Sequence, residues 1–334
     1  MSNRNDISNK LVENARKVDI FIEDILRPKS PEVLYEASRH LILAGGKRIR
    51  PFLTIASCEA VGGDPENAIP YAAGLEILHN FTLIHDDVMD NDSIRRGAST
   101  VHLRYGIPIA ICAGDLLFAK TYEAFSSKAP FKVSNKQIRS CIEIATRATI
   151  EICEGQVLDV SFPNLLNVTE NDYFIMIGKK TSALFRACAE IGAVIGGGSR
   201  RQTNILGKFA FNSGISFQIV DDILGVTSDQ KTLGKPVGSD LREGKKTMIL
   251  IHALRHANSR QRRKLESIIG NKSASNDSFE EVSQILRDLG SISYASKKAD
   301  RYIILAKKQL SKLPESASQQ NLQDLVDYFT QRYF

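Results

Sequence analysis

Apolar residues recur along most of this chain every three or four positions, which is the spacing of one face of an α-helix. The first three predicted helices run from Ile7 to a stop at Pro28, from Ser30-Pro31 to Gly45-Gly46, and from Arg50-Pro51 to Gly62-Gly63. The others cover 64–90, 108–127, 134–161, 170–196, 203–226, 241–257, 278–289, 291–312 and 317–332. Alternation typical of strands is nearly absent. The sequence therefore predicts an all-α protein.

The helices in the middle of the chain are apolar on most sides, as the stretch 187–196 illustrates. A helix that is apolar all round belongs in the centre of a large bundle, where small residues let neighbouring helices approach closely. No linker or shift of composition divides the 334 residues. We therefore predict a single domain over residues 1–334.

Two acidic pairs interrupt apolar, helix-like stretches. Asp86 and Asp90 stand in HDDVMD, and Asp221 and Asp222 stand in QIVDDILG. Carboxylates are costly to bury without a partner, and Asp86 and Asp90 share one helix face. If the two helices face each other across a cavity, their oxygens suit Mg²⁺, which completes its coordination with water and substrate phosphates. The pattern indicates a phosphate-bearing substrate.

Lysine and arginine clusters surround the acidic pairs along the chain and supply the matching cations. Metal ions and fixed Lys or Arg donors are the two standard means of holding a diphosphate and stabilising its departure. The clusters therefore favour a diphosphate substrate. They are Lys47-Arg48-Ile49-Arg50, Arg95-Arg96, Lys179-Lys180, Lys235 and Lys245-Lys246.

The formal charge of +6 and the pI near 9.0 raise the question of a nucleic-acid partner. Many of the basic residues, however, lie in the clusters just described, and the sequence has neither a zinc pattern nor an RNA-binding aromatic motif. The basic run 255–264 is interpreted as a solvated helix face. We expect no nucleic-acid partner.

The five cysteines are odd in number, include no CxxC pair and lie in apolar surroundings, so we interpret them as buried free thiols. Free thiols are typical of a reducing cytoplasm. Residues 1–17 are polar and charged, unlike a secretory signal, and no apolar run is long enough to span a bilayer. We expect a cytoplasmic protein without a transmembrane segment.

Five segments occur in the order typical of one enzyme family: GGKRIRP, HDDVMDNDSIRRG, GKKTSALF, FQIVDDILG and LGKPVGSDLREGKKT. Through them the chain resembles, from about Leu41 to Thr247, the trans-isoprenyl diphosphate synthases, also called polyprenyl synthetases. The resemblance implies the isoprenoid synthase fold, a large bundle of antiparallel helices around a deep central cavity. It also implies a homodimer that condenses isopentenyl diphosphate with an allylic diphosphate.

The resemblance assigns the acidic residues to Mg²⁺, with three ions expected in each active site. Asp86 and Asp90 would carry two ions, and Asp221 would carry the third. Asp87 and Asp222 would orient the site without binding metal directly.

Gly225 departs from the family pattern, because many members have Asp at this fifth position of the second acidic motif. Glycine offers no side chain to a metal ion. Asp229 and Asp240 are nearby acids that support the third ion through water in our interpretation. Some short-chain members share this glycine, so we do not interpret it as a loss of activity.

The resemblance also divides the basic residues between the two substrates. The allylic diphosphate would be held by Arg95, Lys180, Lys235 and Lys245, and isopentenyl diphosphate by Lys47, Arg50, His79 and Arg96. Thr181 and Gln218 would offer oxygen dipoles beside the nascent cation, so that the catalytic set is Lys180, Thr181 and Gln218. An ordinary core role for His79 and a capping or ion-pair role for Lys47 and Arg50 are the alternatives. Structural roles are as plausible as functional ones for Asp115, Gln156 and Asp159.

Product length is expected to depend on the residues four and five places before Asp86, which are Thr82 and Phe81. Phe81 lies roughly 7.5 Å from Asp86 along a helix axis, so its ring would form a floor that blocks the growing chain. One aromatic at this place resembles geranylgeranyl diphosphate synthase, which implies a C20 product. Farnesyl or longer polyprenyl products are the alternatives, with Phe81 then serving as core packing.

Three other classes of protein compete with this reading. His85-Asp86 is also the central pair of HD-type metal phosphohydrolases, which bind metal through imidazole and need no second acidic pair. A non-catalytic regulatory subunit would tend to lose the metal-binding aspartates or the basic residues that this chain keeps. A terpene cyclase would not need two diphosphate sites.

Overall fold

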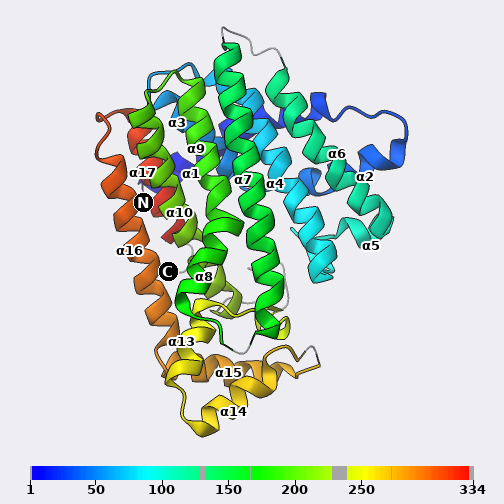
Figure 1. Ribbon diagram of the computed structural model, residues 1–334, viewed down its shortest axis with the longest axis vertical. Coiled ribbons are helices and arrows are strands. Elements are labelled where there is room, and N and C mark those ends of the chain that lie inside the picture. The colour runs from blue at the N-terminus through cyan, green and yellow to red at the C-terminus, as the bar shows by residue number, and fades with distance from the viewer. Residues whose placement is uncertain (1, 128–132, 166, 228–238, 272, 331–334) are drawn as a thin grey trace. The chain divides into compact units, whose positions relative to one another are not determined.

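The computed structural model describes the chain except for residues 1, 128–132, 166, 228–238, 272 and 331–334 (Figure 1). Within these limits the predicted all-α class is confirmed. The described part contains one pair of short antiparallel strands, β1 (Ile94–Arg95) and β2 (Ala98–Ser99). The helices are α1 (Ser2–Ile25), α2 (Glu32–Leu43), α3 (Ile49–Glu59), η1 (Pro65–Ala68), α4 (Ile69–Asp90), α5 (Val101–Tyr105), α6 (Ile107–Ser126), α7 (Asn135–Ser161), η2 (Phe162–Asn164), α8 (Glu170–Ile177), η3 (Gly178–Ser182), α9 (Ala183–Ile195), α10 (Arg200–Thr227), α12 (Ser239–Arg242), α13 (Met248–His256), α14 (Ser259–Ile268), α15 (Asn276–Asp288), α16 (Ser291–Leu310) and α17 (Ala317–Thr330).

The chain divides into two compact units. The first comprises residues 1–149, 184–210 and 307–328, and the second comprises 150–183, 211–306 and 329–334. The division falls within several helices, among them α7 and α10, so neither unit is one continuous segment. The single domain over residues 1–334 stays a prediction.

Close helix packing in the first unit depends on glycines. In Figure 1, α4 runs beside α6, and a Cβ atom added at Gly114 of α6 would lie 2.2 Å from Nε2 of His85 on α4. A Cβ atom at Gly192 of α9 would lie 2.1 Å from the carbonyl oxygen of Thr54 on α3. Neither position has room for a side chain, which agrees with the expectation that small residues let the central helices approach closely.

The core of the second unit forms where α8, α13 and α15 pack with the last part of α10. Tyr173 of α8, Val220 of α10, Met248 of α13 and Phe279 of α15 are all at least 98% buried. The start of α8 is fixed by a capping box, in which the Thr169 and Asp172 side chains bond to each other's backbone amides. This packing fixes the part of α10 that carries the second acidic motif.

Two predicted helix boundaries are wrong. The predicted helix 170–196 consists of α8, the π-helical turn η3 and α9. The predicted helix 241–257 begins only at Met248 (α13), because Gly244 adopts a positive φ of 75° in a turn after α12. Neither interruption changes the helical class.

The prediction of five buried thiols is wrong for two of them. All five cysteines are free, but Cys112 on α6 and Cys153 on α7 are exposed. Burial raises the pKa of the Cys58 and Cys188 thiols to about 12, so both stay protonated at neutral pH. Cys112 was predicted to be buried because its neighbours are apolar, but the exposed face of α6 is itself apolar. None of the described helices is long and apolar enough to cross a membrane.

Candidate active site

The first acidic motif occupies the last turn of α4, which Asn91 closes in the left-handed conformation (φ 55°). Asp86 and Asp90 are partly exposed in this turn. The carboxyl end of a helix carries the negative end of its dipole, and no basic residue lies in the last turn of α4. Carboxylates at this place weaken the helix unless positive charge offsets them. Arg95 supplies some of that charge to Asp86, and a metal ion bound here would supply more.

Asp87 faces inward and is held by an arginine. It is 1% exposed, and its Oδ1 accepts hydrogen bonds from Nε and Nη2 of Arg95 at 2.7 and 2.5 Å. Nη2 of Arg95 also donates to Asp92 at 2.8 Å. Burial alone would lower the pKa of Arg95, but the neighbouring carboxylates outweigh it and raise that pKa. Arg95 on β1 thereby ties the end of α4 to the strand pair that follows.

The donor set at the end of α4 fits Mg²⁺. Asp86 and Asp90 supply hard carboxylate oxygens, and Mg²⁺ in proteins takes few carboxylates together with water and phosphate oxygens. Within each unit, the described residues contain no group of three or more His, Cys, Asp and Glu side chains that could hold a metal. The residues present therefore fit a Mg²⁺ ion that arrives with, or is completed by, a phosphate-bearing substrate.

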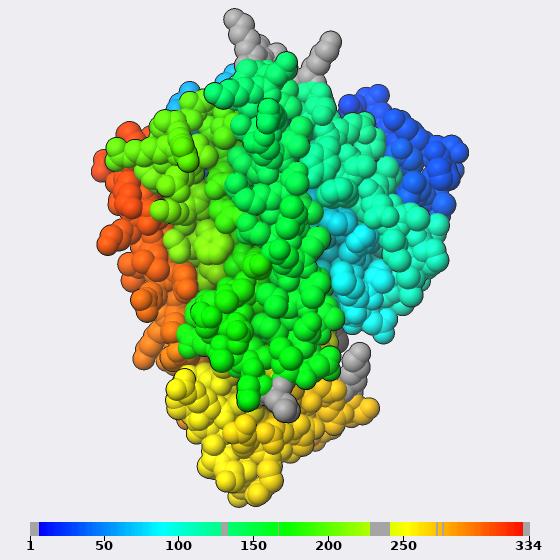
Figure 2. Space-filling model, in the orientation of Figure 1, coloured from blue at the N-terminus to red at the C-terminus, as the bar shows by residue number. Residues whose placement is uncertain are grey.

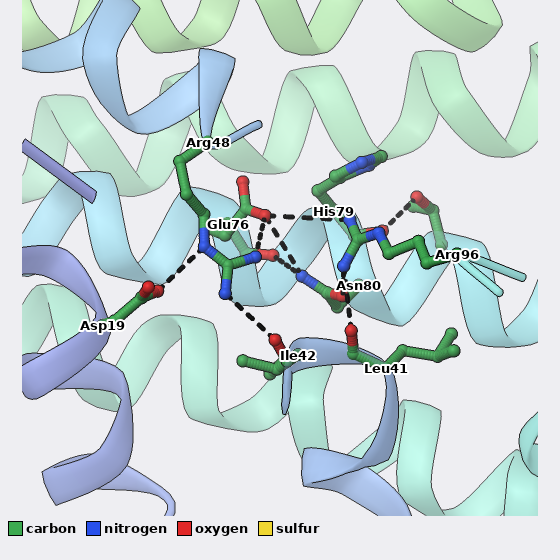
Figure 3. A network of polar contacts seen from close by, with 9 residues as sticks. Asp19, Leu41, Ile42, Arg48, Glu76, His79, Asn80 and Arg96 are labelled. Atoms are coloured by element: carbon green, nitrogen blue, oxygen red, sulfur yellow. Dashed lines mark hydrogen bonds and ion pairs between the residues drawn. The ribbon is translucent and has the colours of Figure 1, made fainter. Parts of the chain in front are cut away.

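A cluster of arginines surrounds a buried glutamate in the first unit (Figure 3). Arg48, with a side chain 4% exposed, donates from Nη1 to Glu76 at 3.0 Å and from Nε to Asp19 at 2.8 Å. Arg96, on the tight turn between β1 and β2, donates from Nη1 to the carbonyl oxygen of Leu41 at 2.9 Å and to Oδ1 of Asn80 at 3.1 Å. The sequence indicated Arg48 only as a member of the basic cluster 47–50, and it gave no signal for Glu76 or Asn80.

His79 lies among these cations. Burial lowers its pKa well below the usual value, and the positive charges of Arg50, Arg96, Arg95 and Arg48 lower it further. The imidazole is therefore neutral at physiological pH. A neutral ring can donate one hydrogen bond to a substrate oxygen without adding a charge that the arginines would repel.

Two other basic residues predicted for this site lie at the start of α3. Lys47 is exposed just before α3 begins, and Arg50 lies in its first turn. The Arg50 guanidinium carbon lies 5.0 Å from the ring centre of Phe185, within range of a cation–π contact. The structure thus places Arg50, His79 and Arg96 in one electrostatic cluster of the first unit.

The second acidic motif lies in the last part of α10, and its two aspartates differ in environment. Asp221 is exposed, whereas Asp222 is 7% exposed and accepts two hydrogen bonds. The Tyr173 hydroxyl donates to Oδ2 at 2.6 Å, and the Gln218 amide donates to Oδ1 at 2.8 Å. Oε1 of Gln218 in turn accepts from the Thr181 hydroxyl at 2.8 Å. A continuous chain of hydrogen bonds, which we call the relay, therefore links Tyr173 to Thr181 through Asp222 and Gln218.

The π-helical turn η3 carries Lys180 and Thr181. A Cβ atom added at Gly155 of α7 would lie 2.3 Å from the backbone nitrogen of Lys180, so η3 and α7 touch through their backbones. Lys180 donates to Asp159 of α7 at 2.5 Å. Single π turns within helices occur often at functional sites, and here the turn sets the direction of two predicted catalytic residues.

One further predicted diphosphate ligand, Lys245, follows α12 in the second unit. Nζ of Lys245 lies 2.9 Å from a carboxylate oxygen of Glu243. Lys235 and Asp229 lie outside the described residues, as does the side chain of Asp240.

The residues predicted to set product length lie one turn before the first acidic motif. The Phe81 ring is partly exposed and packs edge-on against His85, with ring centres 4.8 Å apart. It also meets the ring of Phe118 on α6 at 5.5 Å. The Thr82 hydroxyl donates to the backbone oxygen of His79 at 2.8 Å. Phe118, which the sequence analysis missed, supports Phe81 from the neighbouring helix.

Comparison with known proteins places this arrangement in a family. The polyprenyl synthetase family model matches residues 31–286. The chain is 42% identical over 329 residues to the geranylgeranyl diphosphate synthase of Saccharolobus solfataricus, with 98% of each chain covered. It is 40% identical to the solved geranylgeranyl pyrophosphate synthetase of Pyrococcus horikoshii, with a TM-score of 0.91 and 98% of each chain covered. A polyprenyl synthase from Caulobacter crescentus, solved with calcium and isoprenyl diphosphate, is 31% identical with a TM-score of 0.86 and 97% of each chain covered.

The chain belongs to the polyprenyl synthetase family. The family match includes both acidic motifs and all the basic segments described above.

The hydrogen bond from Tyr173 to Asp222 offers a test of the relay. Replacement of Tyr173 by phenylalanine is expected to lower kcat roughly tenfold with little change in KM, because a hydrogen bond to a charged group contributes about 1.5–3 kcal/mol and orients Gln218. Steady-state kinetics measure the change. The matched control is Tyr71→Phe, since the buried Tyr71 hydroxyl has no hydrogen-bond partner among the described residues. Equal losses in both variants would contradict the relay.

Proposed function

We propose that this chain is a prenyltransferase that joins isopentenyl diphosphate to an allylic diphosphate and releases geranylgeranyl diphosphate, a C20 product. The observation that carries the proposal is the carboxylate-bearing last turn of α4, followed at once by the Arg95-Arg96 turn. It joins metal-binding oxygens to diphosphate-binding cations within a few residues. The geranylgeranyl diphosphate synthase of S. solfataricus, similar over nearly its full length, supports the same activity.

In this proposal Asp86, Asp90 and Asp221 would hold Mg²⁺, which would supply positive charge to neutralise the departing diphosphate. Arg95 can bind the allylic diphosphate through Nη1, since its other two nitrogens donate to Asp87 and Asp92. The buried Asp87 and Asp222 hold neighbouring side chains in place. The allylic diphosphate is gripped by Arg95, Lys180, Lys235 and Lys245.

The difficult step is ionisation of the allylic C–O bond, in which the bonding electron pair leaves with the diphosphate. The Thr181 hydroxyl donates a hydrogen bond to Oε1 of Gln218, so the lone pairs of the Thr181 oxygen stay available to the allylic cation. The Tyr173–Asp222 pair fixes the Gln218 amide whose oxygen accepts this hydrogen bond. Preorganised dipoles of this kind stabilise charge without reorganising during the reaction.

The second substrate, isopentenyl diphosphate, is bound in this proposal by Lys47, Arg50, His79 and Arg96. Its alkene electron pair attacks the allylic cation and forms the new C–C bond. The proton is then lost from the carbon next to the new cationic centre, with the released diphosphate as the base. The neutral His79 acts in binding, and the surrounding arginines prevent it from holding a second proton.

Product length in this proposal is limited by Phe81. The Phe118 ring behind it keeps the Phe81 ring from turning aside, because two rings at 5.5 Å in a packed helix pair leave little free space. In this proposal the single aromatic ring of Phe81 stops the growing chain at C20, and the smaller side chain of Thr82 leaves room for the chain to reach that length. Farnesyl or longer products are the alternatives that the assay below separates.

We further propose that the whole chain acts as one catalytic domain in a cytoplasmic homodimer. Figure 2 shows α6 at the surface in blue-green, and this helix exposes apolar side chains, with Ile107 53% and Ile111 43% exposed. In the second unit, α7 exposes Ile150 and Val157. Exposed apolar faces of this kind mark subunit interfaces.

The dimer is testable through α6. The wild-type chain is expected to sediment as a dimer at micromolar concentration, and Ile111→Asp to sediment as a monomer, because a buried unpaired carboxylate opposes association. The control is Ile20→Asp on α1, where the side chain is 61% exposed but lies outside the proposed interface. A monomeric wild-type chain would contradict the proposal.

The enzyme assay uses pure protein, labelled isopentenyl diphosphate, Mg²⁺ and each of the C5, C10 and C15 allylic diphosphates, followed by chromatography of the dephosphorylated products. Mg²⁺-dependent formation of a C20 product is expected. Release of phosphate without chain growth would instead favour an HD-type phosphohydrolase. The structure argues against that class, because Nε2 of His85 lies 3.2 Å from the carbonyl oxygen of Ile111 and is therefore paired with the backbone. Turnover only after addition of a second protein would indicate a regulatory subunit.

A further inference from the structure

Glu76 is a buried acid that the proposed chemistry does not use. It lies on α4 with its side chain 3% exposed, ten residues before Asp86. A carboxylate so deeply buried is costly unless cations and hydrogen bonds compensate it. Its compensation comes from two arginines and an amide, and one of these arginines belongs to the proposed isopentenyl diphosphate site.

The first arginine, Arg48, is fully committed to the protein. Its three nitrogens donate to Glu76, Asp19 and the carbonyl oxygen of Ile42, at 3.0, 2.8 and 3.0 Å (Figure 3). Each nitrogen of Arg48 therefore already donates to the protein, and the side chain is only 4% exposed, so we assign it no contact with a substrate. Its role is to pin Glu76 to the α2–α3 segment that carries Lys47 and Arg50.

The second arginine, Arg96, is only partly committed. Nη1 is used by Leu41 and Asn80, whereas Nη2 lies 3.9 Å from Oε1 of Glu76, too far for a hydrogen bond. Among the described residues, neither Nη2 nor Nε of Arg96 has a hydrogen-bond acceptor within reach. These two nitrogens remain available to bind an anion.

Asn80 connects the glutamate to this arginine. Its amide nitrogen donates to the backbone oxygen of Glu76 at 2.8 Å and to Oε1 at 3.5 Å. Those two acceptors fix which way the amide points, so its oxygen faces Arg96. Asn80 is fully buried, so water cannot take over either bond.

Gly46 gives independent evidence that the two guanidinium groups are held tightly. A Cβ atom added there would lie 3.1 Å from Nη1 of Arg48 and 3.2 Å from Cζ of Arg96. The backbone of the GGKRIRP segment therefore lies against both groups. The arginines are enclosed between this segment and the Glu76–Asn80 face of α4.

We propose that Glu76 and Asn80 are positioning residues, which orient Arg96 so that its Nη2 and Nε bind the isopentenyl diphosphate. The inference rests on the function proposed above for Arg96. Glu76 attracts the guanidinium of Arg96 through its negative charge. Because their closest atoms do not form a hydrogen bond, the N–H groups on Nη2 stay available to the substrate. Asn80 supplies the direct bond that sets the plane of the guanidinium.

The sign of the effect separates positioning from simple electrostatics. A carboxylate that acted only through its charge would repel the diphosphate, so Glu76→Gln would strengthen binding. A positioning carboxylate has the opposite effect, because its loss releases Arg48 and the turn that carries Arg96. The two roles therefore predict changes of KM in opposite directions.

The experiment measures KM for isopentenyl diphosphate, KM for farnesyl diphosphate, kcat and the thermal unfolding temperature for Glu76→Gln, Asn80→Leu and the wild type. Both variants are expected to raise KM for isopentenyl diphosphate about tenfold, as the loss of one oriented charged hydrogen bond would, with KM for farnesyl diphosphate within twofold of the wild type. The control is Asp19→Asn, which removes the charge of the second carboxylate that Arg48 contacts and leaves Asn80 and Arg96 in place.

A third variant covers the case in which the buried substitutions prevent folding. Gly46→Ala removes no buried group and presses on the guanidinium groups of both Arg48 and Arg96 from the exposed segment, so it is expected to raise KM for isopentenyl diphosphate alone. An unchanged or lower KM for isopentenyl diphosphate, an equal rise for both substrates, or the same rise in Asp19→Asn would overturn the inference while leaving the proposed function intact. A wild-type chain that turns over neither diphosphate would overturn both.

Discussion

Replacement of Asp86 or Asp90 by alanine is expected to lower turnover about a thousandfold, while the thermal unfolding temperature stays the same or rises slightly. The loss of activity follows because a ligand to the metal on a leaving diphosphate contributes several kcal/mol in the transition state. The gain or constancy of stability follows because both carboxylates lie at the negative end of the α4 dipole. Steady-state kinetics and thermal unfolding of the same preparations measure the two effects.

The matched control for this prediction is Asp24→Ala, which removes an exposed carboxylate of α1 whose recorded partner is Arg27. It should leave turnover unchanged. Mg²⁺ with inorganic diphosphate should raise the unfolding temperature of the wild type and of Asp24→Ala, but raise it less for Asp86→Ala and Asp90→Ala. Near-normal turnover in both α4 variants would refute the metal assignment.

Phe81→Ser is expected to extend the product beyond C20, and Thr82→Phe to shift it towards C15. The reason is steric, since a close-packed interior transmits the loss or gain of a ring directly into the shape of a cavity. Phe81 meets Phe118 on the facing helix, so removal of the Phe81 ring opens space that the backbone of α6 cannot close. Chromatography of dephosphorylated products measures the chain-length distribution.

General loss of stability would reduce yield in both variants without moving the two distributions in opposite directions. Phe52→Leu is a suitable control, because it truncates an aromatic residue of the first unit that is buried on α3, rather than one of the rings on α4 and α6. Its product should stay C20. Unchanged chain length in Phe81→Ser and Thr82→Phe, at measurable activity, would mean that another wall limits growth.

The local pattern of the sequence was sufficient for the helical class and for most helix boundaries. The predicted helix 108–127 corresponds to α6 at 107–126, and 134–161 corresponds to α7 at 135–161. Helical periodicity and capping are properties of neighbouring residues, so a single sequence contains them. The same holds for the acidic motifs, because a carboxylate pair in an apolar helix is improbable without a function.

The sequence could not say which of several adjacent polar residues turns inward. In Lys47-Arg48-Ile49-Arg50, it is Arg48, with a left-handed backbone (φ 47°) just before α3, that is buried against Glu76. The π turn at 178–182 is equally hidden, since it depends on the close approach of Gly155 on α7. Both depend on residues far away along the chain.

By itself, the sequence determined the type of chemistry: hard oxygen ligands, phosphate-binding cations and an aromatic residue one turn before the metal motif. Only the tertiary structure decided how these groups are held, through Asp87 on Arg95, Tyr173 on Asp222, and Glu76 with Asn80 on Arg96. The physical reason is that residue type limits what a side chain can bind, whereas its orientation depends on buried hydrogen bonds between segments that only folding brings together.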